Sequence, residues 1–124
     1  MSYYLFQWKY KDPAIKAMVE TPQDRPAELR KAVEAFGGRM HQFFFAFGEY
    51  DGIGIVEFPN NESCAACVVM LTGAGANAIL RTTVLLTPSV GQAAMKRASL
   101  EDSGYRPPSD WAHYRQQAFK GVPS

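Results

Sequence analysis

Apolar and polar positions alternate at the start of the chain, over residues 3–10. Every second position holds an aromatic side chain, and these are Tyr4, Phe6, Trp8 and Tyr10. Because neighbouring side chains of a strand point to opposite faces of a sheet, this two-residue period predicts a strand with one aromatic face. Asp12-Pro13 ends the strand, and residues 15–19 favour a helical turn before Thr21-Pro22.

A helical period of three and four residues follows in the segment 24–36. Its apolar positions would share one side of a helix, and they are Leu29, Ala32, Val33 and Phe36. Asp24 or Thr21 can cap the start of this helix. Gly37-Gly38 can end it, because glycine readily adopts the left-handed conformation found after helices.

Two more helices and a strand are predicted further along the chain. Asn60-Asn61 can cap a helix over residues 62–71, whose small side chains would let it lie close against a sheet. Residues 79–87 are then predicted to form a strand. One face would carry Leu80, Val84 and Leu86, and the other Arg81, Thr83 and Leu85. Pro88 is well placed to open a last helix that runs to about residue 98.

Residues 42–58 contain two apolar runs separated by a short polar stretch that ends in Asp51-Gly52. Asp and Gly tolerate the positive φ of a tight turn, so this pattern predicts a β-hairpin. If the loop has two or four residues, the numbers of paired positions add to an odd value. One face then carries His41, Phe43, Phe45, Phe47, Gly54, Val56 and Phe58, and the other carries Phe44, Ala46, Ile53, Ile55 and Glu57.

The elements follow the order strand, helix, strand, strand, helix, strand, and then a helix and a tail. One antiparallel sheet with helices on a single face is the economical packing of this order, a ferredoxin-like α+β fold. We assign residues 1–98 to this domain and residues 99–124 to a C-terminal extension with a short amphipathic helix. Trp111, Tyr114 and Phe119 carry too much apolar area for a solvated linker, so we expect the extension to dock on the domain or on a partner subunit.

The helix-free face of this sheet would carry a patch of large apolar side chains. Its residues are Leu5, Phe44, Ala46, Ile53, Ile55 and Leu85, beside Gln7, Glu57, Arg81 and Thr83. Soluble monomers rarely expose such a patch, and two sheets can cover each other around a twofold axis. We therefore expect a homodimer whose interface includes Phe44, Ile53, Ile55, Glu57, Arg81 and Leu85. Glu57 and Arg81 should share a polar network with Gln7, because charges persist in apolar surroundings when they are paired.

Charge and composition narrow the classes of function. The chain has 13 basic and 12 acidic residues with interspersed signs, so no basic stripe favours nucleic acid or an anionic membrane surface. No apolar run approaches the roughly 18–20 residues of a membrane helix, and the N-terminus lacks the pattern of a signal peptide. The cysteines, Cys64 and Cys67, are too close together for a secreted disulfide framework, so we expect a reduced, cytoplasmic setting.

Two polar residues of the hairpin region are candidate catalytic groups. Asp51 could orient a substrate or take a proton, and His41 in an aromatic pocket could shuttle a proton or ligate haem. Tyr4, Trp8 and Tyr50 would line that pocket and bind the ligand. The alternatives are structural: Asp51 shapes the turn, His41 is an idle strand-end residue, and the aromatic side chains are core.

Cys64-Ala65-Ala66-Cys67 is a C-x-x-C motif near the start of a predicted helix. A helix N-terminus lowers the pKa of a thiol and so favours redox chemistry, but close helix packing also requires small side chains. We interpret both cysteines as small core residues. No metal site or cofactor is expected, because His113, the other histidine besides His41, lies in the tail and no ligand spacing recurs.

The stretch Phe47-Gly48-Glu49-Tyr50-Asp51-Gly52 resembles the signature of the GYD-domain family, a group of small proteins. Similar elements are Gly37-Gly38, the segment Glu57-Phe58-Pro59-Asn60 and the strand at residues 82–87, so the resemblance covers roughly residues 3–98. It implies a dimeric α/β-barrel relative of the ferredoxin-like fold. The related superfamily includes cofactor-free monooxygenases, haem-handling enzymes, isomerases and small-ligand-binding regulators, so the resemblance implies no particular reaction.

Two function hypotheses follow from these patterns. In the first, the protein binds or transforms a small apolar or aromatic molecule in a pocket between sheet and helices. In the second, it is a non-catalytic assembly or regulatory module that acts through its dimer surface. A cavity with convergent polar groups favours the first hypothesis, whereas a space filled by aromatic side chains favours the second. The sequence by itself names neither a ligand nor a reaction, so it leaves open whether the chain is an enzyme.

Overall fold

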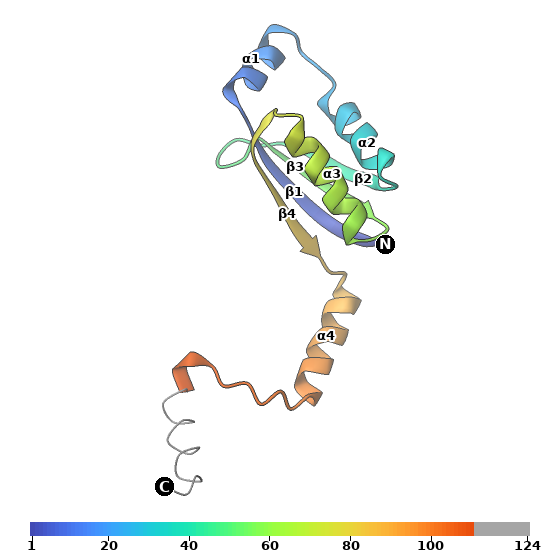
Figure 1. Ribbon diagram of the computed structural model, residues 1–124, viewed down its shortest axis with the longest axis vertical. Coiled ribbons are helices and arrows are strands. Elements are labelled where there is room, and N and C mark those ends of the chain that lie inside the picture. The colour runs from blue at the N-terminus through green and yellow to red at the C-terminus, as the bar shows by residue number, and fades with distance from the viewer. Residues whose placement is uncertain (111–124) are drawn as a thin grey trace, which may run out of the picture. The chain divides into compact units, whose positions relative to one another are not determined.

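A computed structural model of the chain describes residues 1–110. The elements are β1 (Ser2–Tyr10), α1 (Asp12–Glu20), α2 (Arg25–Ala35), β2 (Arg39–Phe45), β3 (Gly52–Phe58), α3 (Asn61–Gly73), β4 (Asn77–Leu85), α4 (Pro88–Leu100) and a 3-10 turn, Pro108–Asp110 (Figure 1). The predicted ferredoxin-like α+β fold is confirmed. The chain forms two compact units, Met1–Gly91 and Gln92–Ser124, and α4 crosses the boundary between them.

The four strands form one antiparallel sheet in the order β2-β3-β1-β4. Helices α2 and α3 pack on the same face of this sheet (Figure 1). The aromatic row of β1 lies on that face and is at most 7% exposed; it consists of Tyr4, Phe6, Trp8 and Tyr10. The alternation of residues 3–10 therefore predicted the buried face of β1 correctly, because aromatic side chains are driven out of water together.

Side chains from three other elements complete the core around this aromatic row. Val33 comes from α2, Val56 and Phe58 from β3, and Cys64 and Cys67 from α3. Both cysteines are almost completely buried, which agrees with the interpretation that α3 needs small side chains to approach the sheet. The core is therefore built between one face of the sheet and two helices, and it positions the site described below.

The predicted caps define the ends of helices α2 and α3. The side chains of Asp24 and Asn60 each accept a hydrogen bond from a backbone N–H three residues later, at 3.1 Å and 2.9 Å. Gly37, with φ of +79°, follows the end of α2. Helix α1 is longer than the predicted turn at residues 15–19. Pro13 lies in its first turn, where the missing N–H would have no partner within the helix, so this proline starts a helix here.

In the pairing of strands β2 and β3, the numbers of paired positions add to an odd value, as predicted. Phe43 pairs with Gly54 and Phe44 with Ile53, so the numbers of paired positions add to 97. The loop between the strands, residues 46–51, is longer than the two or four residues expected. Its six residues are still an even number, and an even loop length preserves the assignment of side chains to faces.

A β-bulge changes the face on which His41 lies. The pairing of β2 with β3 shifts by one position at this residue. One extra residue reverses the alternation of faces, so His41 points to the helix-free face instead of joining Phe43 on the helix side. Its ring lies 5.5 Å from that of Tyr3, and its Nε2 lies 3.0 Å from Oε1 of Glu57. The prediction that His41 shares the helix-side face is therefore wrong.

No helix of the first unit covers the second face of the sheet in the described part of the chain. Leu5 pairs with Ile55 on this face, and Ile53, Ile55, Leu5 and Leu85 are all half-buried. Phe44 is 57% exposed. The strand register thus places these apolar side chains on the face that the sequence predicted for them.

Glu57 and Arg81 lie at opposite ends of this helix-free face. Glu57 pairs with Tyr3 near the start of β1, whereas Arg81 pairs with Gln7 near its end. The carboxylate of Glu57 contacts His41. The expected network of Glu57, Arg81 and Gln7 therefore does not form within one chain, and a contact across a twofold axis stays a prediction.

The predicted docking of Trp111, Tyr114 and Phe119 lies outside the residues that the structure describes. The predicted domain boundary after residue 98 stays a prediction, and the boundary of the first compact unit is Gly91. In the second unit, the end of α4 is followed by an irregular segment, residues 101–107, and the 3-10 turn.

Candidate ligand-binding site

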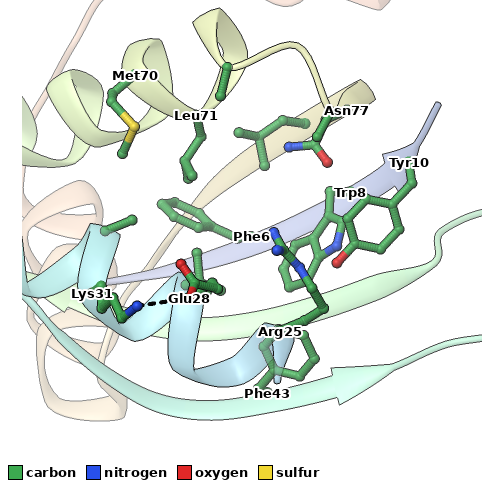
Figure 2. A pocket seen from close by; sticks show the side chains of 15 residues that line it. Phe6, Trp8, Tyr10, Arg25, Glu28, Lys31, Phe43, Met70, Leu71 and Asn77 are labelled. Carbon is green, nitrogen blue, oxygen red and sulfur yellow. Dashed lines mark hydrogen bonds and ion pairs between the residues drawn. The ribbon is translucent and has the colours of Figure 1, made fainter. Parts of the chain in front are cut away.

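A cavity of about 380 Å³ lies between the helical face of the sheet and helices α2 and α3 (Figure 2). Strand side chains form its aromatic wall, and these are Phe6, Trp8, Tyr10 and Phe43. Apolar residues of the helices, the loop after α3 and β4 complete the lining: Leu29, Ala32, Met70, Leu71, Ala74, Ala76 and Leu80. The space is thus bounded by three of the four side chains of the aromatic row that forms the core.

Gly52 of β3 makes room for the indole ring of Trp8, and Gly54 also lies beside this ring. A Cβ atom at Gly52 would stand 2.4 Å from the nearest ring atoms, and one at Gly54 would stand 3.4 Å from the ring. The rings of Phe43 and Tyr10 pack beside the indole, at centroid distances of 5.3 Å and 6.4 Å. These contacts hold Trp8 in place as part of the cavity wall.

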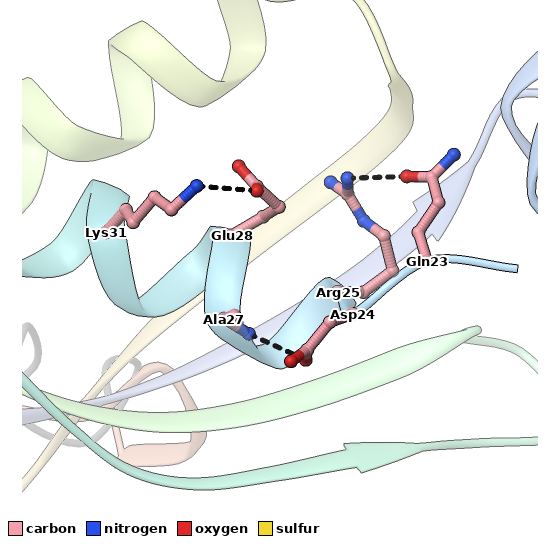
Figure 3. A network of polar contacts seen from close by, with 6 residues as sticks. All are labelled: Gln23, Asp24, Arg25, Ala27, Glu28 and Lys31. Carbon is pink, nitrogen blue, oxygen red and sulfur yellow. Dashed lines mark hydrogen bonds and ion pairs between the residues drawn. The ribbon is translucent and has the colours of Figure 1, made fainter.

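Four polar residues complete the lining. Arg25, Glu28 and Lys31 come from α2, and Asn77 stands at the start of β4. Lys31 Nζ donates to Oε1 of Glu28 at 2.8 Å, and this hydrogen bond, together with the lysine charge, lowers the pKa of Glu28 (Figure 3). Arg25 Nη1 donates to Oε1 of Gln23 at 3.1 Å. Within residues 1–110, no carboxylate lies within 4.0 Å of the Arg25 guanidinium.

Two polar atoms at this cavity are buried without a hydrogen-bond partner among the described residues, Nε of Arg25 and Oδ1 of Asn77. Most buried polar groups in native proteins are paired, and an unpaired one costs roughly 1–3 kcal/mol. The side of the cavity between the start of α2 and the start of β4 therefore has unused hydrogen-bonding capacity.

Asp51 is held by the backbone of β1. Its N–H donates to the Trp8 carbonyl at 2.8 Å, and its Oδ2 accepts from the Tyr10 N–H at 2.9 Å. Lys9 Nζ lies 3.9 Å from Oδ1 of Asp51. These contacts attach the end of the hairpin loop to the end of β1, so the geometry supports the structural role that the sequence offered as the alternative to catalysis.

A second cavity of about 520 Å³ lies beside helix α1 and the hairpin loop. Most of its lining is apolar: Ile15, Met18, Val19, Pro22, Phe45, Ala46 and Phe47. Asp51 and Gln23 add polar groups, and Tyr10 and Arg25 line both this cavity and the first one. Arg25 and Tyr10 therefore lie where the two cavities adjoin.

Of the three residues that the sequence suggested for ligand binding, Trp8 lines the first cavity. Tyr4 is buried in the core, where its hydroxyl donates to Oδ1 of Asn61 at 2.5 Å. Tyr50 is half-buried in the hairpin loop and lines neither cavity. The sequence reasoning missed Arg25 and Asn77, because a charged residue in the first turn of a helix is usually solvated and no periodic pattern marks either position.

Burial raises the pKa of Cys64 and of Cys67 to about 11. Both thiols are therefore protonated at neutral pH and weakly nucleophilic, which supports their interpretation as core residues. Residues 1–110 contain no group of three His, Cys, Asp or Glu side chains that could hold a metal ion. In the same part of the chain, no helix combines the length and apolarity needed to span a membrane.

The sequence profile of the GYD domain matches residues 4–95 of this chain. The chain belongs to the GYD domain family. The match extends from β1 into α4, so it includes most of β1, the other three strands and both helices that cover the cavity. It also contains the segment 47–52 on which the resemblance was based. No match was found among functionally curated proteins.

The solved structure of another protein shows the same fold as this GYD domain. The crystal structure of MtbAldR aligns with a TM-score of 0.53 and 16% sequence identity, over 69% of this chain and 53% of that protein. This chain thus spans about half the length of MtbAldR. Protein Atu4242 from Agrobacterium tumefaciens aligns with a TM-score of 0.43 and 17% identity, over 69% of this chain and 92% of that one. At such identities, the likeness to MtbAldR concerns the fold alone.

Proposed function

We propose that this GYD domain protein binds a small apolar or aromatic organic molecule in the cavity between its sheet and helices α2 and α3. The cavity itself is the observation that carries the proposal, because it combines a volume of about 380 Å³ with an aromatic wall and a few polar groups. Small-molecule pockets typically have volumes of about 300–1,000 Å³ and this mixed lining. A module that acts only through its outer surface has no need for such a space.

The proposal is for binding, because the candidate catalytic groups lie elsewhere. A general acid or base must come within hydrogen-bonding reach of its substrate. His41 lies on the opposite face of the sheet, and Asp51 lines the second cavity while it accepts a hydrogen bond from the Tyr10 backbone. The geometry therefore gives no support to a joint catalytic role of His41 and Asp51 in the first cavity.

Titration with 2-naphthamide, a neutral two-ring probe, tests the proposed function. The chain has two tryptophans, Trp8 and Trp111, so a Trp111→Phe background makes the fluorescence specific for Trp8. We expect quenching that saturates with probe concentration, because the probe would stack against the indole in the cavity wall. Quenching that rises linearly, without saturation, would contradict the proposal.

Two matched substitutions on α2 locate the binding. Ala32 lines the cavity, whereas Ala35 is exposed on the same helix. We expect Ala32→Leu to fill the cavity and to weaken binding about tenfold, which corresponds to a loss of about 1.4 kcal/mol. Ala35→Leu should leave the affinity unchanged. Equal affinities of the two variants would place the probe outside this cavity.

A second candidate function, assembly through a homodimer, is favoured by the helix-free face of the sheet. Leu5, Ile53, Ile55 and Leu85 are half-buried there, and Phe44 is 57% exposed. We infer that two copies cover these faces mutually, since contiguous apolar surface of this kind marks an interaction site. The free thiols of Cys64 and Cys67 fit the reducing, cytoplasmic setting that we propose for this dimer.

A further inference from the structure

The first cavity has an excess of positive charge in its lining. Its three charged side chains are Arg25, Glu28 and Lys31, which give a formal net charge of +1. Glu28 and Lys31 pair with each other at 2.8 Å, and Arg25 donates to the neutral side chain of Gln23. Among the residues that the structure describes, Arg25 is therefore the charged residue of this lining that has no ion-pair partner within 4.0 Å, although its charge also helps to lower the pKa of Glu28.

Arg25 also differs from the other two charged residues in its surroundings. The side chains of Lys31 and Glu28 are 72% and 50% exposed, so water screens their charges. Arg25 is half-buried, and its Nε has neither a protein partner in the described chain nor access to water. A partly buried guanidinium with unused donors gains more free energy from binding an anion than a fully solvated guanidinium does.

The cavity wall that Arg25 faces is aromatic. Arg25 shares the lining of the first cavity with Trp8, Tyr10 and Phe43, and Figure 2 shows its guanidinium extending from α2 toward this aromatic wall. An occupant that suits both features needs a flat apolar body and one negatively charged end. A planar carboxylate suits the guanidinium best, because it can accept two parallel N–H···O hydrogen bonds.

We propose that the ligand of this cavity is a small aromatic carboxylic acid whose carboxylate binds Arg25 and whose ring packs against Trp8. This inference rests on the proposed function and specifies its ligand class. The formal net charge of +1 in the lining matches a single negative charge. A phosphate group would bring more negative charge into the cavity than Arg25 can offset, and a buried charge without a partner is strongly unfavourable.

The probes 2-naphthoate and 2-naphthamide test this proposal, because they share one ring system and differ in charge. Calorimetric titration of the full chain at neutral pH measures the affinity for each probe. We expect 2-naphthoate to bind about tenfold more tightly or better, as charge-assisted hydrogen bonds are stronger than neutral ones. Arg25→Gln should reduce this preference to about twofold or less, since its side chain keeps hydrogen-bond donors and loses the charge.

Arg30→Gln is the matched control, because Arg30 is exposed on the same helix and does not line the cavity. It should keep the full preference for 2-naphthoate. Circular dichroism verifies that each variant folds. If Arg25→Gln does not fold, Arg25→Met provides the same test, because it removes the charge and keeps a long unbranched side chain. A reduced preference in Arg25→Met supports the proposal, and an unchanged one overturns it.

The outcomes separate the ligand class from the proposed function. Equal affinities of the unmodified protein for the two probes would overturn the carboxylate proposal and leave binding of aromatic molecules standing. Failure of both probes to bind would overturn the proposed function itself. A preference for 2-naphthoate that survives Arg25→Gln would also overturn the proposal, because the anion would then bind elsewhere.

Discussion

The indole ring of Trp8 lies directly against the backbone of Gly52, its partner across strands β1 and β3. A Cβ atom at Gly52 would stand 2.4 Å from two ring atoms, which is closer than non-bonded heavy atoms come. The sequence pattern Asp51-Gly52 suggested a tight turn with positive φ, but Gly48 has the positive φ in this loop, at +136°. Gly52 is therefore needed for the space that it leaves to Trp8.

Gly52→Ala should destabilise the protein by about 1–3 kcal/mol, because the new methyl group would displace the Trp8 ring in a packed core. Urea unfolding measures this change, and a shifted Trp8 emission in the Trp111→Phe background would report the displaced ring. Gly73→Ala is the control, because no atom lies within 4 Å of a Cβ at that position. Equal stabilities of the two variants would contradict the steric argument.

Asp51→Ala should lower the free energy of unfolding by about 1–3 kcal/mol, since the Tyr10 N–H would lose its acceptor. Urea unfolding measures the loss, and Glu49→Ala, at an exposed position of the same loop, should change the stability little. The affinity for 2-naphthamide should remain unchanged. Weaker probe binding without any loss of stability would favour a ligand-binding role of Asp51 over the structural one.

The stability of the protein should fall as the pH rises above 9.0, the usual pKa of a thiol. Burial raises the pKa of Cys64 and Cys67 to about 11, so the unfolded chain loses its thiol protons at a lower pH than the folded one. Their contribution to stability is therefore complete below pH 9.0 and is lost toward pH 11.

Urea unfolding over a series of pH values checks whether the stability falls with rising pH. A Cys64→Ala, Cys67→Ala double variant provides the reference, because it differs from the unmodified protein in these two thiols alone. The stability difference between the unmodified protein and the double variant should shrink as the pH rises. A constant difference would show that neither thiol titrates differently in the two states.

Ile55→Glu should dissociate the proposed homodimer or unfold the chain, because an unpaired charge in an apolar interface costs several kcal/mol. Sedimentation velocity measures the association state, and the interface should bury on the order of 1,200–2,000 Å² in total. Val69→Glu is the control, since Val69 is 70% exposed on α3. If the unmodified protein sediments as a monomer at micromolar concentration, the homodimer proposal is wrong.

Local sequence patterns were sufficient to predict the helices and strands and to assign most of their side chains to the buried or the exposed face. The aromatic alternation of residues 3–10 identified the buried side of β1, and the caps Asp24 and Asn60 identified the starts of α2 and α3. Such signals are readable because they depend on neighbours one to four residues away. The parity of the hairpin pairing was also readable, because any loop with an even number of residues gives the same assignment of faces.

The cavity could not be read from the sequence, because its polar residues converge only when separate elements pack together. Arg25 from α2 and Asn77 from β4 are far apart in the chain, and neither stands in a motif. Trp8 was predicted to line a pocket, but the packing of its ring against Gly52 depends on the register between strands β1 and β3. The candidate site is therefore a product of tertiary packing around a predictable core.

The sequence by itself determined the strand and helix order, the aromatic core face and the apolar helix-free face, since each follows from a periodic pattern. Tertiary structure decided the position of His41. A single extra residue in the pairing of β2 with β3 moves this side chain from the Trp8 side of the sheet to the side of Glu57. A bulge depends on how two strands meet, and a side-chain period of two turns that one-residue shift into a change of face.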